Sequence, residues 1–214
     1  MKLVAMFGLT VLLAACGGGG GDSAPAVATP VAPIPVASAE GFWEGTASTG
    51  NVVSLAVLET GETWGVYSSS GAIVGALFGN TTSLNGSSLS GSGTDFNIPS
   101  RTVGAGTYSG TFSANSTIRV ATSSGSTFSG TYVPAYDQPA SIAALAGSFS
   151  GQGVSGSSPV QNASIIVSAS SNITVPATLG CSASGTVAPR PGGKNIYNLT
   201  VTFAGSTCAL GNGA

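Results

Sequence analysis

The stretch Thr63-Trp64-Gly65-Val66-Tyr67 carries an apolar side chain at every second position, which is the period of a β-strand. The stretch Asn198-Leu199-Thr200-Val201-Thr202-Phe203 alternates in the same way. Short β-rich runs like these two recur along the chain from Gly41 onward, separated by Gly, Ser, Asn and Pro. Because no helical crossover lies between them, we expect neighbouring runs to pair as an antiparallel meander. The sequence therefore predicts an all-β fold.

The expected strands are bounded by residues that favour turns. Glu59-Thr60-Gly61, Asn85-Gly86 and Pro191-Gly192-Gly193-Lys194 each have the composition of a hairpin turn. One short helical turn is expected near 141–146, after Pro139 and before Gly147. The strands are expected at 42–46, 52–58, 63–68, 73–78, 87–91, 103–112, 117–122, 127–133, 147–151, 163–168, 179–187 and 196–203.

An aromatic-x-Gly triplet recurs along the chain. Residues i and i+2 of a strand share a face, so each aromatic ring lies beside a position without a side chain. Such a position permits strong coiling of the strand, and a neighbouring ring can cover the exposed backbone. We therefore expect the meander to curl into a β-barrel with an aromatic and aliphatic interior and a Ser/Thr exterior, with a β-sandwich as the alternative. The triplets are Trp43-Glu44-Gly45, Tyr108-Ser109-Gly110, Phe128-Ser129-Gly130 and Phe149-Ser150-Gly151.

Two similar openings divide the region 41–214. Phe42-Trp43-Glu44-Gly45 begins the first, and Leu145-Ala146-Gly147-Ser148-Phe149-Ser150-Gly151 begins the second. We expect a β-barrel-like domain with two related halves, 41–136 and 147–214. The second half is shorter, so either the halves differ or the second is truncated. A truncated half would leave an unpaired edge strand near the C-terminus.

Composition excludes several functions. The 214 residues carry a net charge of -2 with only 5 Lys and Arg, so we expect no electrostatic binding of nucleic acid. The chain contains no histidine, which excludes Ser-His-Asp and Cys-His catalysis and removes the commonest metal ligand. We expect no catalytic residues, no metal and no cofactor, and hence no enzyme. The catalytic alternative is a glycosidase-like carboxylate pair, drawn from Glu44, Glu59, Glu62, Asp95 and Asp137.

The N-terminus has the layout of a processing signal. Lys2 precedes an apolar run at 3–13, which is shorter than the roughly 20 residues that span a bilayer. The run ends in Leu13-Ala14-Ala15-Cys16, which resembles the lipobox of bacterial lipoproteins. The resemblance implies a signal peptide at 1–15, cleavage before Cys16, lipidation of the Cys16 thiol and acylation of the new amino terminus. An ordinary secretory signal is the alternative.

Several acyl chains would give a stable membrane anchor, whereas one chain gives marginal binding. Gly17 follows Cys16 where inner-membrane lipoproteins often carry aspartate, so the lipoprotein sorting rule implies the bacterial outer membrane, facing either the periplasm or the surface. Residues 16–40 form a Gly/Pro/Ala-rich flexible tether in this interpretation. The tether resembles those of surface lipoproteins such as factor H-binding protein and transferrin-binding protein B.

The domain resembles those of proteobacterial outer-membrane lipoproteins that carry a β-barrel-like domain and no assigned activity. The resemblance rests on the opening Phe42-Trp43-Glu44-Gly45-Thr46 and the connector Tyr136-Asp137-Gln138-Pro139-Ala140-Ser141. It transfers no activity and no site residue to this chain.

Two cysteines remain beside Cys16. In an oxidising envelope compartment, Cys181 and Cys208 favour a disulfide, which would stabilise the fold by roughly 3 kcal/mol in the chain-entropy model. A reactive or metal-binding pair is disfavoured, because neither a histidine nor a C-x-x-C spacing supports it.

Two functions fit these observations. One is a lipid-anchored envelope protein with a non-catalytic binding or surface-interaction role, whose contact with the membrane runs through the acyl chains on Cys16. The alternative is a periplasmic carrier that holds a small apolar ligand inside the barrel. The sequence identifies neither a ligand nor a protein partner. Trp43, Trp64, Tyr67 and Tyr108 serve either core packing or a ligand cavity.

Overall fold

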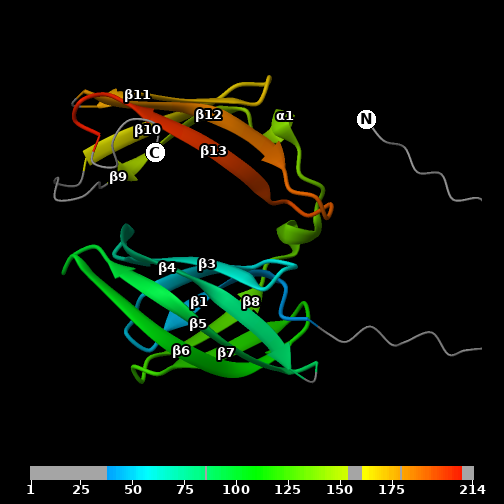
Figure 1. Ribbon diagram of the computed structural model, residues 1–214. Coiled ribbons are helices and arrows are strands. Elements are labelled where there is room, and N and C mark those ends of the chain that lie inside the picture. The colour runs from blue at the N-terminus through cyan, green and yellow to red at the C-terminus, as the bar shows by residue number, and fades with distance from the viewer. Residues whose placement is uncertain (1–37, 85, 154–160, 179, 209–214) are drawn as a thin grey trace, which may run out of the picture. The chain divides into compact units, whose positions relative to one another are not determined.

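The computed structural model describes residues 38–84, 86–153, 161–178 and 180–208. The predicted signal peptide, Cys16 and most of the predicted tether lie outside these ranges. The described chain is mostly β-strand and forms a closed barrel and a separate sheet (Figure 1). This confirms the all-β prediction, and of the two alternatives for the first half the barrel is correct.

The barrel has eight antiparallel strands, each paired with the next in sequence (Figure 1). It closes between the first strand and the last, where the register runs from the pair Trp43–Tyr132 to the pair Ala47–Phe128. The strands are β1 (Gly41–Ala47), β2 (Val52–Val57), β3 (Glu62–Ser69), β4 (Ala72–Leu84), β5 (Ser88–Asn97), β6 (Thr102–Ser113), β7 (Thr117–Thr122) and β8 (Thr127–Tyr132).

A plug of packed side chains seals the end of the barrel at which the chain enters. Trp43, at the start of β1, is 0% exposed, and its Nε1 donates a hydrogen bond to the Ala39 carbonyl oxygen at 3.1 Å. The Tyr132 ring meets the indole edge-on, with ring centroids 5.2 Å apart. This cluster, which we call the plug, is completed by Leu55, Val57, Leu89, Phe112 and Ile118.

The aromatic-x-Gly triplets explain how the strands come close enough to coil. A β-carbon at Gly45 would overlap the Ser129 carbonyl oxygen in β8, and one at Gly110 would overlap the Arg119 carbonyl oxygen in β7. At Gly130, the ring of Phe128 occupies the space that a side chain would need. The glycines of these three triplets are therefore required by close contact, as the curled-sheet interpretation expects.

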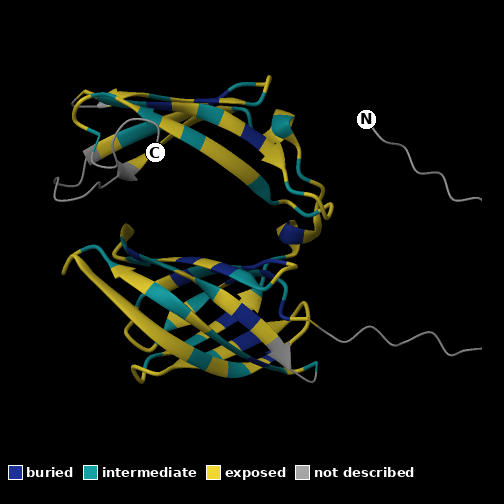
Figure 2. Cartoon of the chain, viewed as in Figure 1, coloured by how far each residue is buried: buried dark blue, intermediate teal, exposed yellow. Residues whose placement is uncertain are grey.

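The expected Ser/Thr exterior holds for much of β5 and β6 but is wrong where large apolar side chains of β3 to β6 are exposed. Buried and exposed positions alternate along the barrel strands (Figure 2), but the apolar positions of the stretch 63–67 are the exposed ones. The reason is that Thr63 and Tyr67 face inward and satisfy their hydroxyls by hydrogen bonds, which leaves the apolar alternation on the outside. We define the outer apolar face as Trp64, Val66, Phe78, Phe96 and Val103, all exposed.

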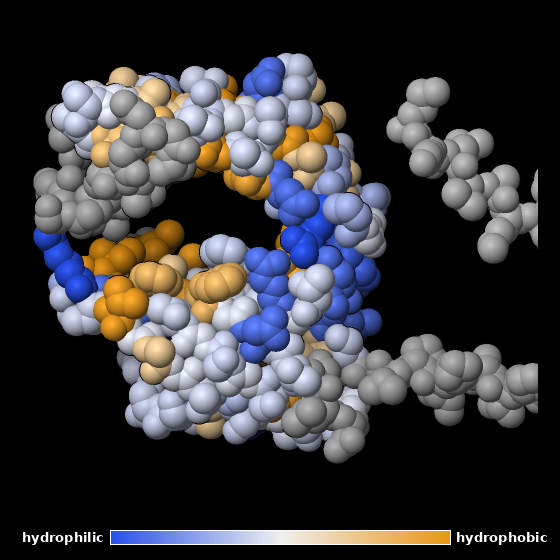
Figure 3. Space-filling model, viewed as in Figure 1, coloured by the Kyte–Doolittle hydropathy of each residue, from blue (hydrophilic) through white to orange (hydrophobic). Residues whose placement is uncertain are grey.

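Cross-strand register joins these residues into one surface. Val66 in β3 pairs with Ala76 in β4, which pairs with Phe96 in β5, which pairs with Val103 in β6. Figure 3 shows hydrophobic side chains gathered on the barrel over β3 and β4.

The second sheet contains β9 (Gly147–Gly153), β10 (Gln161–Val167), β11 (Asn172–Thr178), β12 (Cys181–Pro189) and β13 (Tyr197–Ala204). Its order is β13-β12-β11-β10-β9, so within the described residues β9 and β13 are edge strands. Its small core of Val167, Ile173 and Val187 packs against Ile142 and Leu145 of the connector.

Strand β11 was not expected from the sequence. It contains Pro176, which lacks a backbone donor and so argues against a strand. The structure accommodates Pro176 where the register with β12 shifts between Val175 and Thr178.

The connector between the two sheets contains the predicted helical turn. It consists of the 3-10 helix η1 (Pro134–Asp137) and α1 (Ile142–Leu145), and the Ser141 side chain caps α1 by accepting from the Ala144 amide. The Cys181–Cys208 disulfide is also confirmed, with Cα atoms 4.9 Å apart.

Candidate ligand cavity in the barrel

A cavity of about 470 Å³ lies inside the barrel, between the plug, whose Leu55, Val57, Leu89 and Ile118 line it, and the opposite end. The loops that line it, around Thr49 and Ser124, follow the far ends of β1 and β7. The volume falls within the range of small-molecule sites, about 300–1,000 Å³. The apolar part of the wall is formed by Val53, Leu55, Val57, Leu77, Val120 and Phe128.

Tyr67 lies flat along the cavity wall. Its ring, from β3, crosses Gly75 in β4, where a β-carbon would overlap the ring. Its hydroxyl then donates a hydrogen bond to Asp95 Oδ1 in β5 at 2.9 Å. Burial, together with the hydrogen bond to Asp95, raises the pKa of Tyr67 to about 12. The Tyr67 proton therefore stays in place near neutral pH and remains directed at Asp95.

Tyr108 repeats this arrangement in the opposite direction. Its ring, from β6, crosses Gly91 in β5, and its hydroxyl lies 2.7 Å from Thr81 Oγ1 in β4. Thr81 Oγ1 in turn lies 2.7 Å from Thr63 Oγ1 in β3, which donates to the Gly61 carbonyl at 2.9 Å. A carbonyl only accepts, so Thr81 donates to Thr63 and Tyr108 donates to Thr81. The Tyr108 oxygen is left with acceptor capacity.

These two tyrosines help to explain why the barrel is hollow. Eight-stranded barrels are just wide enough for side chains to fill or for one small ligand to enter. Here two large rings lie along the wall over glycines, and inward positions of β4 to β6 are often glycine. Gly104, which pairs with Asp95 on the inner face, has no atom within 4 Å of its β-carbon position.

The four aromatic candidates from the sequence have three different positions. Tyr67 and Tyr108 line the cavity. Trp43 is part of the plug, and Trp64 lies on the outer apolar face. Asp95 has a role that the sequence did not suggest, because a turn-forming role is more typical of Gly-Thr-Asp-Phe-Asn.

The remaining candidate carboxylates lie elsewhere. Glu44 is exposed on the outer face of β1. Asp137 forms an ion pair with Lys194 at 2.6 Å, and the pKa of Asp137 is lowered by hydrogen bonds from Lys194 and Tyr132. Arg190 forms ion pairs with both remaining glutamates. Its Nε lies 2.9 Å from Glu59 Oε1, and its Nη2 lies 3.5 Å from Glu62 Oε2.

Within the described part of the chain, no group of three or more His, Cys, Asp or Glu side chains is placed to hold a metal ion. Among the same residues, no helix has the length and apolarity to cross a membrane.

No family model, no curated protein and no solved structure matches this chain. A barrel fold by itself does not specify an activity. The cavity is therefore the feature that bears on function: its wall contains apolar side chains, one end is open, and Asp95 lies at that mouth.

Proposed function

We propose that this chain is a lipid-anchored envelope protein whose barrel binds a small apolar ligand. The observation that carries the proposal is the cavity of about 470 Å³, which is closed at one end by the plug and has aliphatic and aromatic side chains in its wall beside Ser, Thr and Asn. A ligand that enters it exchanges contact with water for contact with this wall, which is favourable at about 25 cal/mol per Å² of apolar surface.

The lipobox supports the anchored part of the proposal. The chain enters the barrel beside the plug, at Ala39, so the mouth lies at the other end of the barrel. The proposed location is the bacterial outer membrane.

Mass spectrometry of the protein from its native host tests the anchor. The mature N-terminus is expected at Cys16, with acyl chains on its thiol and on its amino group, because cleavage and lipidation follow a lipobox. A mature chain that begins at another residue, or that carries Cys16 unmodified, would contradict this part of the proposal and would leave the cavity argument unaffected.

Filling the cavity tests the binding function. Gly104→Leu adds a side chain to the inner face where no atom lies within 4 Å and where the backbone has an ordinary strand conformation. We expect the barrel to fold, because the added side chain enters empty space. A ligand would then have to share that space with the leucine. Its affinity, measured with the neutral fluorophore N-phenyl-1-naphthylamine, is expected to fall by about tenfold or more, since overpacking costs on the order of 1–3 kcal/mol. Fluorescence titration of the purified protein measures this change.

The matched control is Ala121→Leu in the neighbouring strand β7. Ala121 is exposed and lies two positions from the outward-facing Arg119, so a leucine is again introduced into a barrel strand, but outside the barrel. Affinity is expected to stay within about twofold of the parent protein, since a site that the ligand does not touch contributes little. Equal loss in both variants, or in neither, would argue against binding in the cavity.

The outer apolar face supports a second candidate, a surface interaction with another protein. Trp64 is 52% exposed and Phe78 is 43% exposed, and their ring centroids lie 4.6 Å apart. Contiguous exposed apolar patches often mark interaction sites. The two roles use opposite sides of one wall, so Gly104→Leu separates them: it changes the inner side and leaves Trp64 and Phe78 in place.

A further inference from the structure

We infer that the ligand carries a hydrogen-bond donor at its polar end, in the strongest case a protonated amine, and that this end lies beside Asp95 at the mouth of the cavity. The inference rests on the proposed function, since it specifies which apolar ligand the barrel selects. It predicts an amphiphile with a cationic or hydroxyl head, and it disfavours fatty acids and lipid phosphates.

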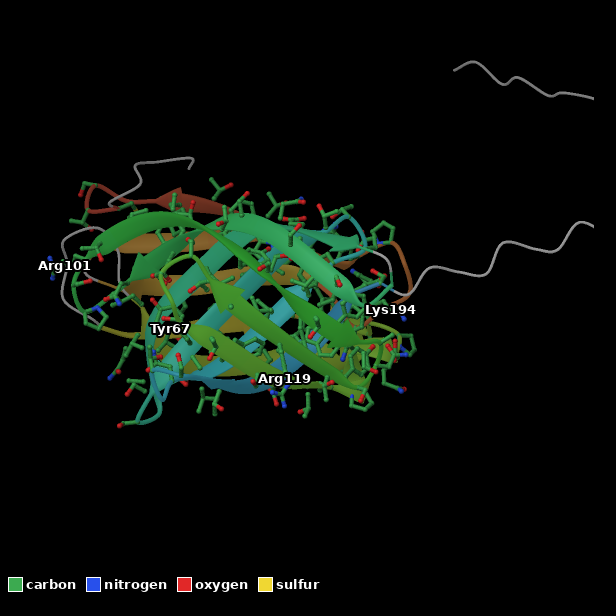
Figure 4. The ribbon with its side chains drawn as sticks, turned by 90° about the horizontal axis from the view of Figure 1, so that it is seen from below. Tyr67, Arg101, Arg119 and Lys194 are labelled. Carbon is green, nitrogen blue, oxygen red and sulfur yellow. A yellow bond between two sulfur atoms is a disulfide. The ribbon has the colours of Figure 1, made fainter. Side chains whose placement is uncertain are left out.

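Charge is the first argument. Among the described residues that line the cavity, Asp95 is the only one with a formal charge, and Lys and Arg are absent from the lining. Arg119 is on the outward side of β7, and Arg101 lies at the tip of the β5–β6 hairpin, toward the same end of the barrel as Tyr67 (Figure 4). A carboxylate or phosphate head at the mouth would meet Asp95 without a lining cation to offset the repulsion.

Hydrogen-bond capacity at the mouth is the second argument. Tyr67 donates its only proton to Asp95 Oδ1. A carboxylate has about four acceptor positions on its two oxygens, so Asp95 retains acceptor capacity after binding Tyr67. A ligand donor can use this capacity, whereas a ligand acceptor gains nothing from Asp95.

The hydroxyl groups deeper in the cavity also favour a ligand that donates a hydrogen bond. The chain of hydroxyls runs from Tyr108 through Thr81 and Thr63 to the Gly61 carbonyl, and each proton is directed away from Tyr108. Tyr108 therefore offers its oxygen as an acceptor. Both tyrosines donate to wall residues, so Tyr67, Tyr108 and Asp95 together favour a ligand that donates.

Geometry places the donor at one end of the ligand. Apolar side chains line the interior from the plug to Phe128, and Asp95 is solvent-accessible at the mouth. An alkyl or aryl body therefore occupies the interior while its head stays at Asp95, in partial contact with water. Because this contact is solvent-exposed, the electrostatic preference is expected to be moderate and not decisive for binding itself.

A series with one tail and three heads tests the inference. Dodecylamine, dodecanol and dodecanoate are compared below their micellar concentrations at neutral pH, by displacement of N-phenyl-1-naphthylamine from the purified full chain. We expect dodecylamine to bind about fivefold more tightly than dodecanol, which is the upper range for an exposed ion pair, and dodecanoate to bind most weakly. Asp95→Asn should remove the advantage of the amine over dodecanol, because it removes the negative charge at the mouth.

Glu44→Gln is the matched control, because it removes one carboxylate from the outer face of β1 and changes the net charge equally. The amine should keep its advantage in this variant. An advantage that persists in Asp95→Asn, or that disappears in Glu44→Gln, would overturn the assignment to Asp95.

The outcomes also separate the inference from the proposed function. If none of the three compounds displaces the fluorophore and the fluorophore itself does not bind, the cavity function fails. If all three bind equally, or dodecanoate binds most tightly, the cavity function stands and the donor inference is wrong. Tighter binding of dodecanoate would indicate that the positive charge of Arg101, and not the carboxylate of Asp95, determines which head group is preferred at the mouth.

Discussion

Replacing Trp43 by alanine is expected to lower the free energy of unfolding of the barrel by about 3–5 kcal/mol, the usual cost of removing a large aromatic side chain from a packed core. The indole is 0% exposed, contacts the Tyr132 ring and donates to the Ala39 carbonyl. The variant loses these contacts together and leaves the plug open. Urea denaturation followed by circular dichroism measures the loss.

Trp64→Ala is the control, because the chain offers the same side chain on the other side of the wall. Trp64 is 52% exposed and packs against Phe78 on the outer apolar face. Its replacement is expected to cost less than about 1 kcal/mol, since surface substitutions away from special contacts have small effects. Similar losses in the two variants would contradict the assignment of Trp43 to the plug and Trp64 to the exterior.

The contrast between these tryptophans shows where sequence reasoning ends. Alternation in 63–67 correctly predicts a strand, because period two is a local property of the backbone. It does not say which of the two faces points inward. In β3 the inward face carries Thr63 and Tyr67, whose hydroxyls are satisfied by partners on other strands, so the more apolar face became the outer one.

The cavity shows the same limit more strongly. Tyr67 and Asp95 are 28 residues apart, and Tyr108 and Thr81 are 27 apart. Each pair meets only because the register aligns a glycine on the strand between them. No local pattern encodes this alignment, so the site of Asp95 could not be predicted from the sequence, although Tyr67 and Tyr108 were among the candidates.

Features that depend on local chemistry were easier to predict. The helical turn follows from Pro139 before it and Gly147 after it, and the disulfide follows from the count of cysteines in an oxidising compartment. Strand ends were less predictable. β4 runs to Leu84 and β5 to Asn97, beyond the expected ends at 78 and 91, because Gly/Ser/Thr-rich extensions pair through their backbone without an apolar alternation.

Gly45→Ala is expected to destabilise the barrel by about 3 kcal/mol, the upper end of the usual range for overpacking. The backbone of Gly45 has no positive φ, so its conformation suits alanine, and the whole effect is steric. The added methyl group would overlap the Ser129 carbonyl oxygen and approach the Gly130 Cα in β8. Both atoms belong to backbone that cannot rotate away, and they lie on the strand pair that closes the barrel.

Tryptophan fluorescence during urea unfolding reports this effect, because Trp43 and Trp64 both lie in the barrel. Gly104→Ala is the control: it adds the same methyl group to another barrel strand, at a position with no atom within 4 Å. Its stability should stay within about 0.5 kcal/mol of the parent or rise slightly, since alanine lowers the entropy of the unfolded chain. A stable Gly45→Ala variant would mean that β1 and β8 do not approach as closely as the closed barrel requires. A large loss in Gly104→Ala would mean that the space beside Asp95 is filled, and the cavity would lose its main support.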